Sequence, residues 1–244
     1  MTAYFISGAS SGLGAEMARQ LVARGDSVAL AARRLDRLEA LEQELAALPG
    51  KVSVHALDVT DAAAVVASMT MADTQLGGLD VVVVNAGVGG GARLGTGGFA
   101  RNRALIETNL TGALAQIEAA LELFRARGMG HLVLVSSLAS VRGLPGSAAV
   151  YSATKAALAV VGESLRIELA GSGIAVTTLR PGYIRTDLSA SSRFPYLSPL
   201  EQGVSAMIAA MDSRRGDVVV PAWPWRPLGW LLRAAPAALI RRFL

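Results

Sequence analysis

The sequence contains no cysteine and only two histidines, His55 and His131. The absence of cysteine excludes disulfide bonds, thiolate metal sites and thiol nucleophiles, and it fits the reducing cytoplasm. Two histidines are too few for a histidine-rich metal centre, so we predict that the chain binds no metal ion.

Charge is also scarce in this chain. Asp, Glu, Lys and Arg make up 17% of the residues, and the formal net charge is only +4. The arginines are scattered rather than clustered, which argues against a nucleic-acid-binding surface. The first residues lack the basic region and long apolar run of a signal peptide, so we expect a cytoplasmic protein.

Apolar residues are abundant, at 52%, and no linker rich in proline and serine divides the 244 residues. The chain can therefore bury a large core as one domain. Strand and helix patterns alternate, which predicts an α/β, Rossmann-type fold: a doubly wound parallel sheet of seven strands with helices on both faces. The predicted strands are residues 3–7, 27–31, 52–57, 81–84, 131–135, 174–179 and 217–220.

A glycine-rich turn, Ser7-Gly8-Ala9-Ser10-Ser11-Gly12-Leu13-Gly14, joins the first strand to a helical pattern that runs to Ala23. Glycines allow a tight turn and close approach of a ligand to the backbone. The helix that follows offers free N–H groups and a positive dipole end to a pyrophosphate. A strand, a glycine turn and a helix in this order predict a dinucleotide site.

The second strand ends in Ala32-Arg33-Arg34 and not in an acidic residue. An aspartate there would hold the ribose hydroxyls of NAD, whereas arginines favour the 2′-phosphate of NADP. Solvation of a loop is the alternative role for the two arginines. After the third strand, Asp58 is a candidate acceptor for an adenine amino group, and Asp61 is predicted to cap the next helix.

Two further helices carry polar residues of interest. A helical pattern over residues 101–127 contains Asn109, and another begins at Tyr151. Tyr151 and Lys155 are four residues apart, so they share one face of that helix. A phenol beside an ammonium group can transfer a proton. The loops 88–101 and 187–199 and the C-terminal stretch are expected to shape a substrate pocket.

The last stretch, residues 223–244, differs from the domain that we assign to residues 1–222. It holds all three tryptophans and four arginines. It is too short, and too broken by Arg233 and Pro236, to span a bilayer. We read it as an extension of the same domain and leave three roles open: a basic amphipathic segment on anionic lipid, a subunit contact, or a lid.

Taken together, these motifs resemble the short-chain dehydrogenase/reductase family across residues 3–220. The family more often has threonine where Ser7 stands. The pieces that carry the resemblance are the glycine turn, Asn85-Ala86-Gly87, Asn109, Ser137, Tyr151-x-x-x-Lys155 and Pro181-Gly182.

The resemblance implies an NADP(H)-dependent oxidoreductase that moves a hydride between nicotinamide and an apolar carbonyl/alcohol substrate. Tyr151 would be the general acid in reduction and the base in oxidation. Lys155 would lower the pKa of Tyr151 and hold the nicotinamide ribose. Ser137 would hydrogen-bond the substrate oxygen, and Asn109 would keep a water in line with Lys155.

The resemblance also implies a cofactor-binding set along one edge of the sheet. The phosphates would be held by Gly8, Ser10, Ser11, Gly12, Leu13 and Gly14, and the 2′-phosphate by Arg33 and Arg34. The adenine would lie between Asp58 and Val59. The ribose would contact Asn85, Ala86, Gly87, Tyr151 and Lys155, and the nicotinamide would contact Pro181, Gly182, Ile184 and Thr186.

Two departures from the family pattern concern the substrate side. Thirteen residues separate Ser137 from Tyr151, one more than is usual, and the turn at Gly143 could absorb the excess. Ser136 is therefore the alternative catalytic serine. Ser140 stands where many relatives have glycine.

Partners and alternatives complete the prediction. Family members are commonly dimers or tetramers, so we expect a homo-oligomer. Leu94, Phe99, Phe194, Tyr196 and Trp223 suggest an apolar pocket. The alternative functions are a cofactor-binding sensor or scaffold without turnover, and a membrane-surface reductase of lipid-like substrates.

Overall fold

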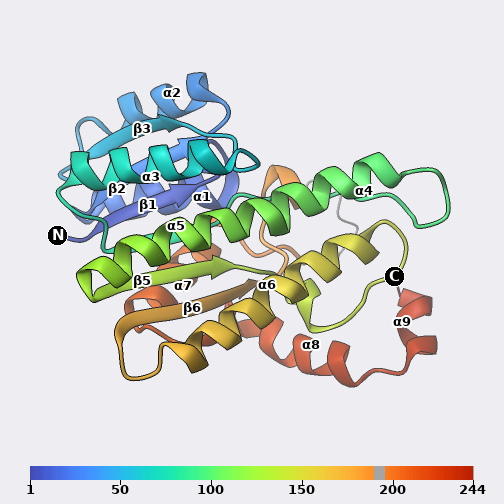
Figure 1. Cartoon of the computed structure of the whole chain (residues 1–244). Helices are drawn as coiled ribbons and strands as arrows, with labels where there is room; N and C mark the ends of the chain where they lie inside the picture. The colour runs from blue at the N-terminus through green and yellow to red at the C-terminus, as the bar shows by residue number, and fades with distance from the viewer. Residues whose placement is uncertain (190–195, 244) are drawn as a thin grey trace.

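Seven parallel strands form one sheet in the order β3-β2-β1-β4-β5-β6-β7 (Figure 1). The computed structural model describes residues 1–189 and 196–243. The order reverses between β1 and β4, which is where doubly wound sheets bind ligands, and it confirms the predicted Rossmann-type single domain. The strands are β1 (Ala3–Ser7), β2 (Ser27–Ala32), β3 (Val52–Ala56), β4 (Val81–Val84), β5 (Met129–Val135), β6 (Gly173–Pro181) and β7 (Asp217–Val220).

The central strands form because their residues are apolar on both faces. Every residue of β1, β2 and β4 is buried, and β4 consists of four valines. Side chains alternate between the two faces of a strand, so Tyr4 and Ile6 join one core while Phe5 joins the other. A parallel sheet buried on both sides follows from this composition.

Helices cover both faces of the sheet. One core lies under α1 (Gly12–Ala23), α2 (Leu35–Leu45) and α7 (Leu200–Asp212), and the other under α3 (Ala62–Leu76), α5 (Gly112–Arg127) and α6 (Ala148–Glu168). Figure 1 shows α5 and α6 in front of the sheet and α7 behind it. The predicted N-cap of α3 is confirmed, since Asp61 Oδ1 accepts the N–H of Ala64 at 3.0 Å.

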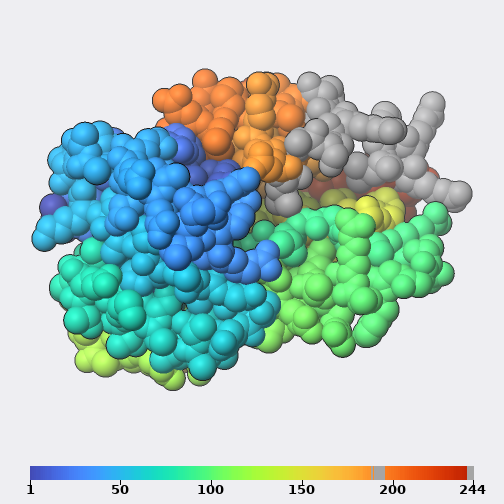
Figure 2. All heavy atoms as spheres, turned by 90° about the horizontal axis from the view of Figure 1, so that it is seen from above, coloured from blue at the N-terminus to red at the C-terminus, as the bar shows by residue number. Residues whose placement is uncertain are grey.

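The helical segment predicted over residues 101–127 is not one regular helix. It consists of α4 (Phe99–Ile106), a π-helical turn over Glu107–Thr111, and α5. Asn109 lies in the π turn, where an asparagine side chain can serve neighbouring backbone instead of destabilising a regular helix. Figure 2 shows, from above, that α4 lies at the opposite end of the molecule from α2 and α3.

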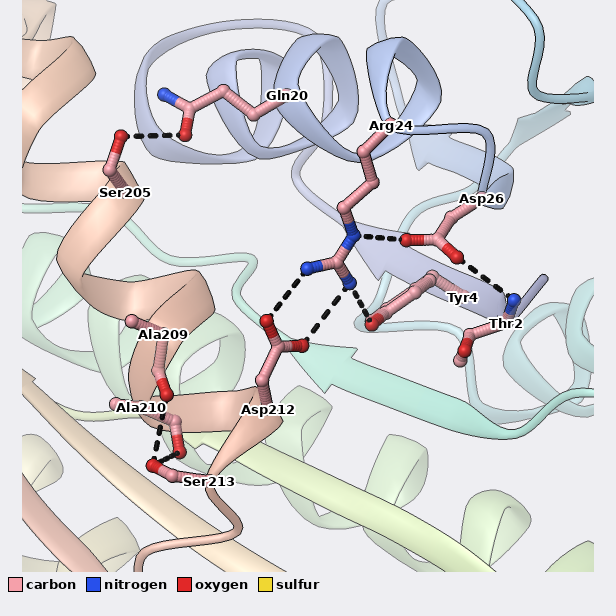
Figure 3. Close-up of polar contacts among 10 residues, drawn as sticks. All are labelled: Thr2, Tyr4, Gln20, Arg24, Asp26, Ser205, Ala209, Ala210, Asp212 and Ser213. Carbon is pink, nitrogen blue, oxygen red and sulfur yellow. Dashed lines mark hydrogen bonds and ion pairs between the residues drawn. The ribbon is translucent and has the colours of Figure 1, made fainter.

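A polar cluster ties α1 and α7 to the amino end of the sheet (Figure 3). The Arg24 guanidinium donates to Asp212 at 2.7 Å, to the Tyr4 hydroxyl at 2.8 Å and to Asp26. Asp26 in turn accepts the N–H of Thr2 at 2.9 Å. Burial raises the pKa of Tyr4 to about 12, so its hydroxyl stays protonated. This cluster is structural, because it lies at the amino ends of the strands, away from the ligand edge.

The C-terminal segment forms two helices, α8 (Ala222–Ala234) and α9 (Ala237–Phe243). Trp223 has a non-helical conformation (φ −104°, ψ 136°), so the chain bends before α8 becomes regular. Within residues 1–189 and 196–243, no helix is long and apolar enough to cross a membrane.

Candidate active site

The glycine turn fits closely against the end of β4. Gly8 has φ +68°, and a Cβ atom there would lie 2.9 Å from the Cα of Ala86. A Cβ atom at Gly14 would lie 2.5 Å from the carbonyl oxygen of Gly8. Both positions therefore require glycine. Gly8 has a positive φ and lies close to Ala86, and Gly14 brings the helix into direct contact with the turn.

Ser7 joins the two loops, a role that the sequence analysis did not assign to it. Its hydroxyl accepts the N–H groups of Asn85 at 3.0 Å and of Ala86 at 2.9 Å. The Asn85 side chain returns a hydrogen bond to the Ser7 carbonyl at 2.8 Å. The available signal was the hydroxyl residue at the end of β1, where the family more often has threonine, since both residues carry the oxygen that accepts these bonds.

The amino end of α1 is suited to an anion. No acidic residue lies in its first turn, and the Ser11 side chain does not cap it. The Arg34 guanidinium lies across the turn and donates to Ser10 Oγ at 2.9 Å and to Ser11 Oγ at 2.7 Å. Free N–H groups, the helix dipole and a guanidinium thus meet at one place.

The adenine-side residues lie nearby. Asp58 Oδ1 accepts the backbone N–H of Thr60 at 3.0 Å and its hydroxyl at 2.8 Å. The Thr60 backbone hydrogen bond lowers the pKa of Asp58, and exposed Arg33 contributes through its charge. Val59 is buried against Gly112 of α5. Both Arg33 and Arg34 are solvent-exposed, and Arg34 is the one that is hydrogen-bonded to the turn.

Asn109 and Lys155 meet at Gly87. A Cβ atom at Gly87 would lie 3.2 Å from Asn109 Oδ1 and 3.4 Å from Lys155 Nζ. Asn109 is held by both backbone groups of Val88: its Oδ1 accepts the N–H at 2.7 Å, and its Nδ2 donates to the carbonyl at 2.8 Å. The π turn therefore serves to aim this amide at the loop after β4.

Ser137 and Tyr151 form the other half of the cluster. The Ser137 hydroxyl hydrogen-bonds the Tyr151 phenol, which is buried although the residue as a whole is partly exposed. Neighbouring Ser136 is turned away: its hydroxyl donates to the carbonyl oxygen of Lys155 at 2.7 Å. The turn at Gly143, which was expected to absorb the extra residue, lies in the loop between Val141 and the start of α6 at Ala148.

The protein's own groups raise the pKa of Tyr151, whereas the sequence analysis expected a lowered pKa. Burial raises the pKa of its phenol, and the hydrogen bond with Ser137 opposes the rise. Burial also lowers the pKa of Lys155 to about 8. The Lys155 ammonium donates to the carbonyl oxygen of Val135 at 2.8 Å. A lowered Tyr151 pKa was expected; without further positive charge, desolvation outweighs the lysine.

The segment after β6 lies over the glycine turn. A Cβ atom at Gly12 (φ +56°) would lie 3.5 Å from Thr186, which brings the two cofactor segments together. Ile184 does not point outward, because its side chain is buried against Gly203 of α7. Only its backbone is left to face a ligand. Pro181 ends β6 and is buried.

Helix α8 packs an aromatic residue against the segment that follows β6. Trp225 is fully buried, and a Cβ atom at Gly182 would lie 2.2 Å from its indole ring. Its Nε1 donates to Ser198 Oγ at 2.8 Å, and its ring lies 5.6 Å from that of Tyr183 and 6.0 Å from that of Tyr196. Sequence reasoning missed Trp225, because nothing local distinguishes it from the other two tryptophans.

Three of the five residues predicted to line an apolar pocket are solvent-exposed. Leu94, Phe99 and Trp223 are 65%, 76% and 78% exposed, so they do not line an enclosed cavity. Tyr196 is 47% exposed and contacts Trp225. Phe194 lies outside the described residues.

Ser140 is part of a support beneath the serine loop. Its hydroxyl donates to the Ser137 carbonyl and accepts a hydrogen bond from Arg180 on β6. Arg180 also pairs with Asp217 through two contacts of 2.7 Å. The departure from glycine at position 140 thus adds a side-chain link between β6 and Ser137.

Sequence comparison decides the family. The model of the short chain dehydrogenase family matches residues 2–195, most of the chain. This protein is a short-chain dehydrogenase. Its membership confirms the resemblance and the general activity, an oxidoreductase that uses a nicotinamide cofactor.

Known relatives agree with this assignment. An uncharacterized oxidoreductase of Mycobacterium tuberculosis (strain CDC 1551) is 49% identical over 241 residues, which cover 98% of this chain and 95% of that protein. A short-chain dehydrogenase of Sphingobium yanoikuyae, solved with NADPH, is 25% identical and covers 99% of this chain and 95% of its own, with a TM-score of 0.84. A 3-ketoacyl-(acyl-carrier-protein) reductase of Brucella melitensis, solved with NADH, is 24% identical, covers 89% and 96%, and has a TM-score of 0.80. That last likeness concerns the fold.

Proposed function

We propose that this short-chain dehydrogenase is an NADP(H)-dependent reductase or dehydrogenase of a carbonyl/alcohol pair, with Tyr151 as its general acid and base. The observation that carries the proposal is the convergence of Asn109 and Lys155 at Gly87, beside the bonded pair of Ser137 and Tyr151. A sensor without turnover needs only the nucleotide cradle, so this second cluster favours an enzyme.

The residues around the glycine turn fit a dinucleotide. Gly8 and Gly14 let the turn pack tightly against Ala86 and the start of α1, and the Arg34 guanidinium lies at the anion-binding end of α1. The nicotinamide, when bound, donates or accepts the hydride. Lys155 would hold the ribose, while the backbone of Ile184 and the Thr186 side chain would seat the ring.

Tyr151 handles the proton in this scheme. A free phenol has a pKa of about 10, and burial raises that of Tyr151, so the group is protonated near neutral pH. A protonated phenol is the form that donates to a carbonyl oxygen during reduction. Oxidation of an alcohol needs the phenolate, which the Lys155 ammonium and the positive ring of an oxidised cofactor would favour.

Ser137 is the better candidate for the substrate-binding serine. Its hydroxyl faces the phenol that would give up the proton, whereas the Ser136 hydroxyl is engaged with the backbone of α6. A donor placed beside the reacting oxygen stabilises the charge that develops there.

The preference for NADP(H) rests on two arginines and no acidic residue at the end of β2. Arg34 already touches two serines of the glycine turn, and Arg33 is exposed beside Asp58. Two guanidinium groups can pair with a 2′-phosphate, for which NAD offers only a hydroxyl. The Sphingobium relative solved with NADPH is consistent with this preference.

The test is a panel of carbonyls and alcohols read by NADPH absorbance, with binding followed separately by NADPH fluorescence. Tyr151→Phe should lower turnover of any active substrate by a factor of about 100 to 10,000, the usual contribution of a general acid. NADPH affinity should change little, since the ring remains. Normal turnover by this variant would contradict the mechanism, and tight binding with no active substrate in the panel would favour the sensor.

We also propose that the protein is a homodimer or homotetramer. Exposed apolar residues on α5 and α6, namely Leu114, Val160 and Ile167, would supply part of the contact. Light scattering of the purified chain measures the state directly, and a monomer at micromolar concentration would contradict it.

A further inference from the structure

The positive charge of this chain is concentrated at one end. The 23 lysines and arginines exceed the 19 acidic residues by four. Residues 218–244 contain four arginines and no acidic residue, so residues 1–217 are neutral as a whole. The last segment therefore carries the entire net charge of the protein.

Helix α8 presents two different faces. Its inner face is anchored by buried Trp225 and Gly229. On the outer side Trp230 is 75% exposed and Leu231 60% exposed, and Trp223 is 78% exposed at the bend before the helix. Arg226, Trp230 and Arg233 are four and three residues apart and all exposed, so they lie on one face.

The arginines of this outer face are not used within the protein. Among the described side chains, neither Arg226 nor Arg233 takes part in an ion pair. Elsewhere many arginines are paired with carboxylates, for example Arg19, Arg24, Arg103, Arg125, Arg127, Arg166 and Arg180. The surface thus combines large apolar side chains with free cations.

This chemistry fits an anionic lipid surface better than a second copy of the chain. A two-fold contact through the same face would bring the arginines of both copies together with no acidic residue to offset them. Tryptophan favours the boundary between headgroups and acyl chains, and arginine pairs with lipid phosphate.

We propose that the outer face of α8, continued by α9 with its exposed Leu239, binds peripherally to bilayers that contain anionic lipids. Trp223, Trp230 and Leu231 enter the headgroup region, and the arginines contact lipid phosphates. The inner face of the same helix packs on Gly182 and on Leu138, one residue from Ser137. Arg142, after the serine loop, donates to the carbonyl oxygens of Leu232 and Ala235.

Docking would therefore bring the bilayer to the substrate end of the candidate site. Figure 1 shows α8 and α9 on the side toward which the strand arrows point. The proposal does not depend on the proposed reaction, because vesicle binding is measured without turnover.

The experiment uses the full chain and two kinds of vesicle, phosphatidylcholine alone and phosphatidylcholine with about 30% phosphatidylglycerol. Binding is read by co-sedimentation and by intrinsic fluorescence. All three tryptophans lie in α8, so a blue shift of the emission reports on this helix alone. We expect binding and a blue shift with the anionic vesicles, both weakened by added salt. Equal binding to both vesicle types, or no binding to either, would overturn the proposal.

Paired variants test the two components of the surface. Arg226→Gln with Arg233→Gln should weaken partitioning by about 10- to 30-fold, since each basic residue near an anionic surface contributes about fivefold. Trp230→Ser with Leu231→Ser should weaken it by about tenfold or more.

Matched controls keep these results specific. Arg37→Gln with Arg215→Gln removes two other exposed arginines, and Met71→Ser removes an apolar side chain that is 54% exposed on α3. Neither control should change vesicle binding, and NADPH fluorescence checks that every variant is folded. The proposal fails if the controls weaken binding as much as the α8 variants. It also fails if Trp230→Ser with Leu231→Ser converts an oligomer to a monomer, because the face would then be a subunit contact.

Discussion

The nucleotide side and the substrate side of the candidate site differ in how the chain forms them. On the nucleotide side, neighbouring residues in the sequence form the site: the glycine turn and the arginines that follow β2 lie within 34 residues of the N-terminus. On the substrate side, Trp225 packs against Gly182 of the predicted nicotinamide seat and donates to Ser198, so that three separate segments meet. Local motifs therefore supply most of the first side, although Gly8 also packs on Ala86, whereas the second side depends on long-range packing throughout.

This difference has a consequence for substitutions. A change on the nucleotide side acts on backbone geometry or charge at a single turn. A change on the substrate side acts through contacts between segments, and its effect depends on how well those segments repack. The following predictions test that contrast.

The largest effect is expected at Gly8. Gly8→Ala places a Cβ atom 2.9 Å from the Cα of Ala86 and forces alanine into φ +68°. We expect a loss of about 100-fold in NADPH affinity and about 2–4 kcal/mol of stability, because backbone at the turn must move. Fluorescence titration and thermal unfolding measure the two.

Gly25→Ala is the matched control. Gly25 also has positive φ (+93°), but nothing lies within 4 Å of its would-be Cβ atom. It should lose only about 1 kcal/mol and keep its NADPH affinity. Equal effects of the two substitutions would show that the fit against Ala86 is unimportant.

A smaller effect is expected at Arg34. Arg34→Ala removes the guanidinium that spans Ser10 and Ser11, and should weaken NADPH binding by about 10- to 100-fold, the range for a charged hydrogen bond. NADH binding should change less than threefold. The ratio of the two dissociation constants is the measurement, with Arg37→Ala as control. Parallel losses for both cofactors would assign Arg34 to holding the turn and not to the 2′-phosphate.

Trp225 tests the substrate side. Trp225→Phe keeps an aromatic ring but removes the 2.8 Å hydrogen bond to Ser198. Because Trp225 lies against Gly182, at the nicotinamide end of the predicted cofactor set and not at the phosphate-binding glycine turn, we expect kcat/KM to fall about tenfold while NADPH affinity stays within about threefold. Trp230→Phe, on the outer face of α8, should leave both unchanged. A loss of NADPH affinity in Trp225→Phe without a change in KM would place α8 on the cofactor side.

The last prediction concerns pH and joins the two sides at Lys155. Burial lowers its pKa to about 8, below its unfolded value of about 10.5, so the unfolded chain binds more protons between these pH values. The folded state therefore gains stability as pH rises through this window. Relative to Lys155→Met, wild type should gain about 2 kcal/mol between pH 7 and pH 10, as measured by urea unfolding. A constant difference would show that Lys155 is not desolvated.

The site could be predicted from the sequence where single residues have one role. Asp61 caps α3 and the glycine turn precedes α1 as predicted, because caps and turns depend on a few neighbouring residues. Asn109 was placed in a regular helix, and the π turn that aims it at Val88 was not foreseen. Such a turn depends on what the side chain meets 21 residues away in the chain.

The sequence by itself determined the seven-stranded parallel fold, the family and the residues that line the nucleotide turn, because periodicity, glycine spacing and charge at strand ends act locally. Only the tertiary structure decided which serine faces Tyr151, which arginine reaches the glycine turn and which tryptophan covers Gly182. It also separated the two faces of α8, where one tryptophan is fully buried and another 75% exposed. Identical residue types receive these different roles from the packing of distant segments, which no local pattern records.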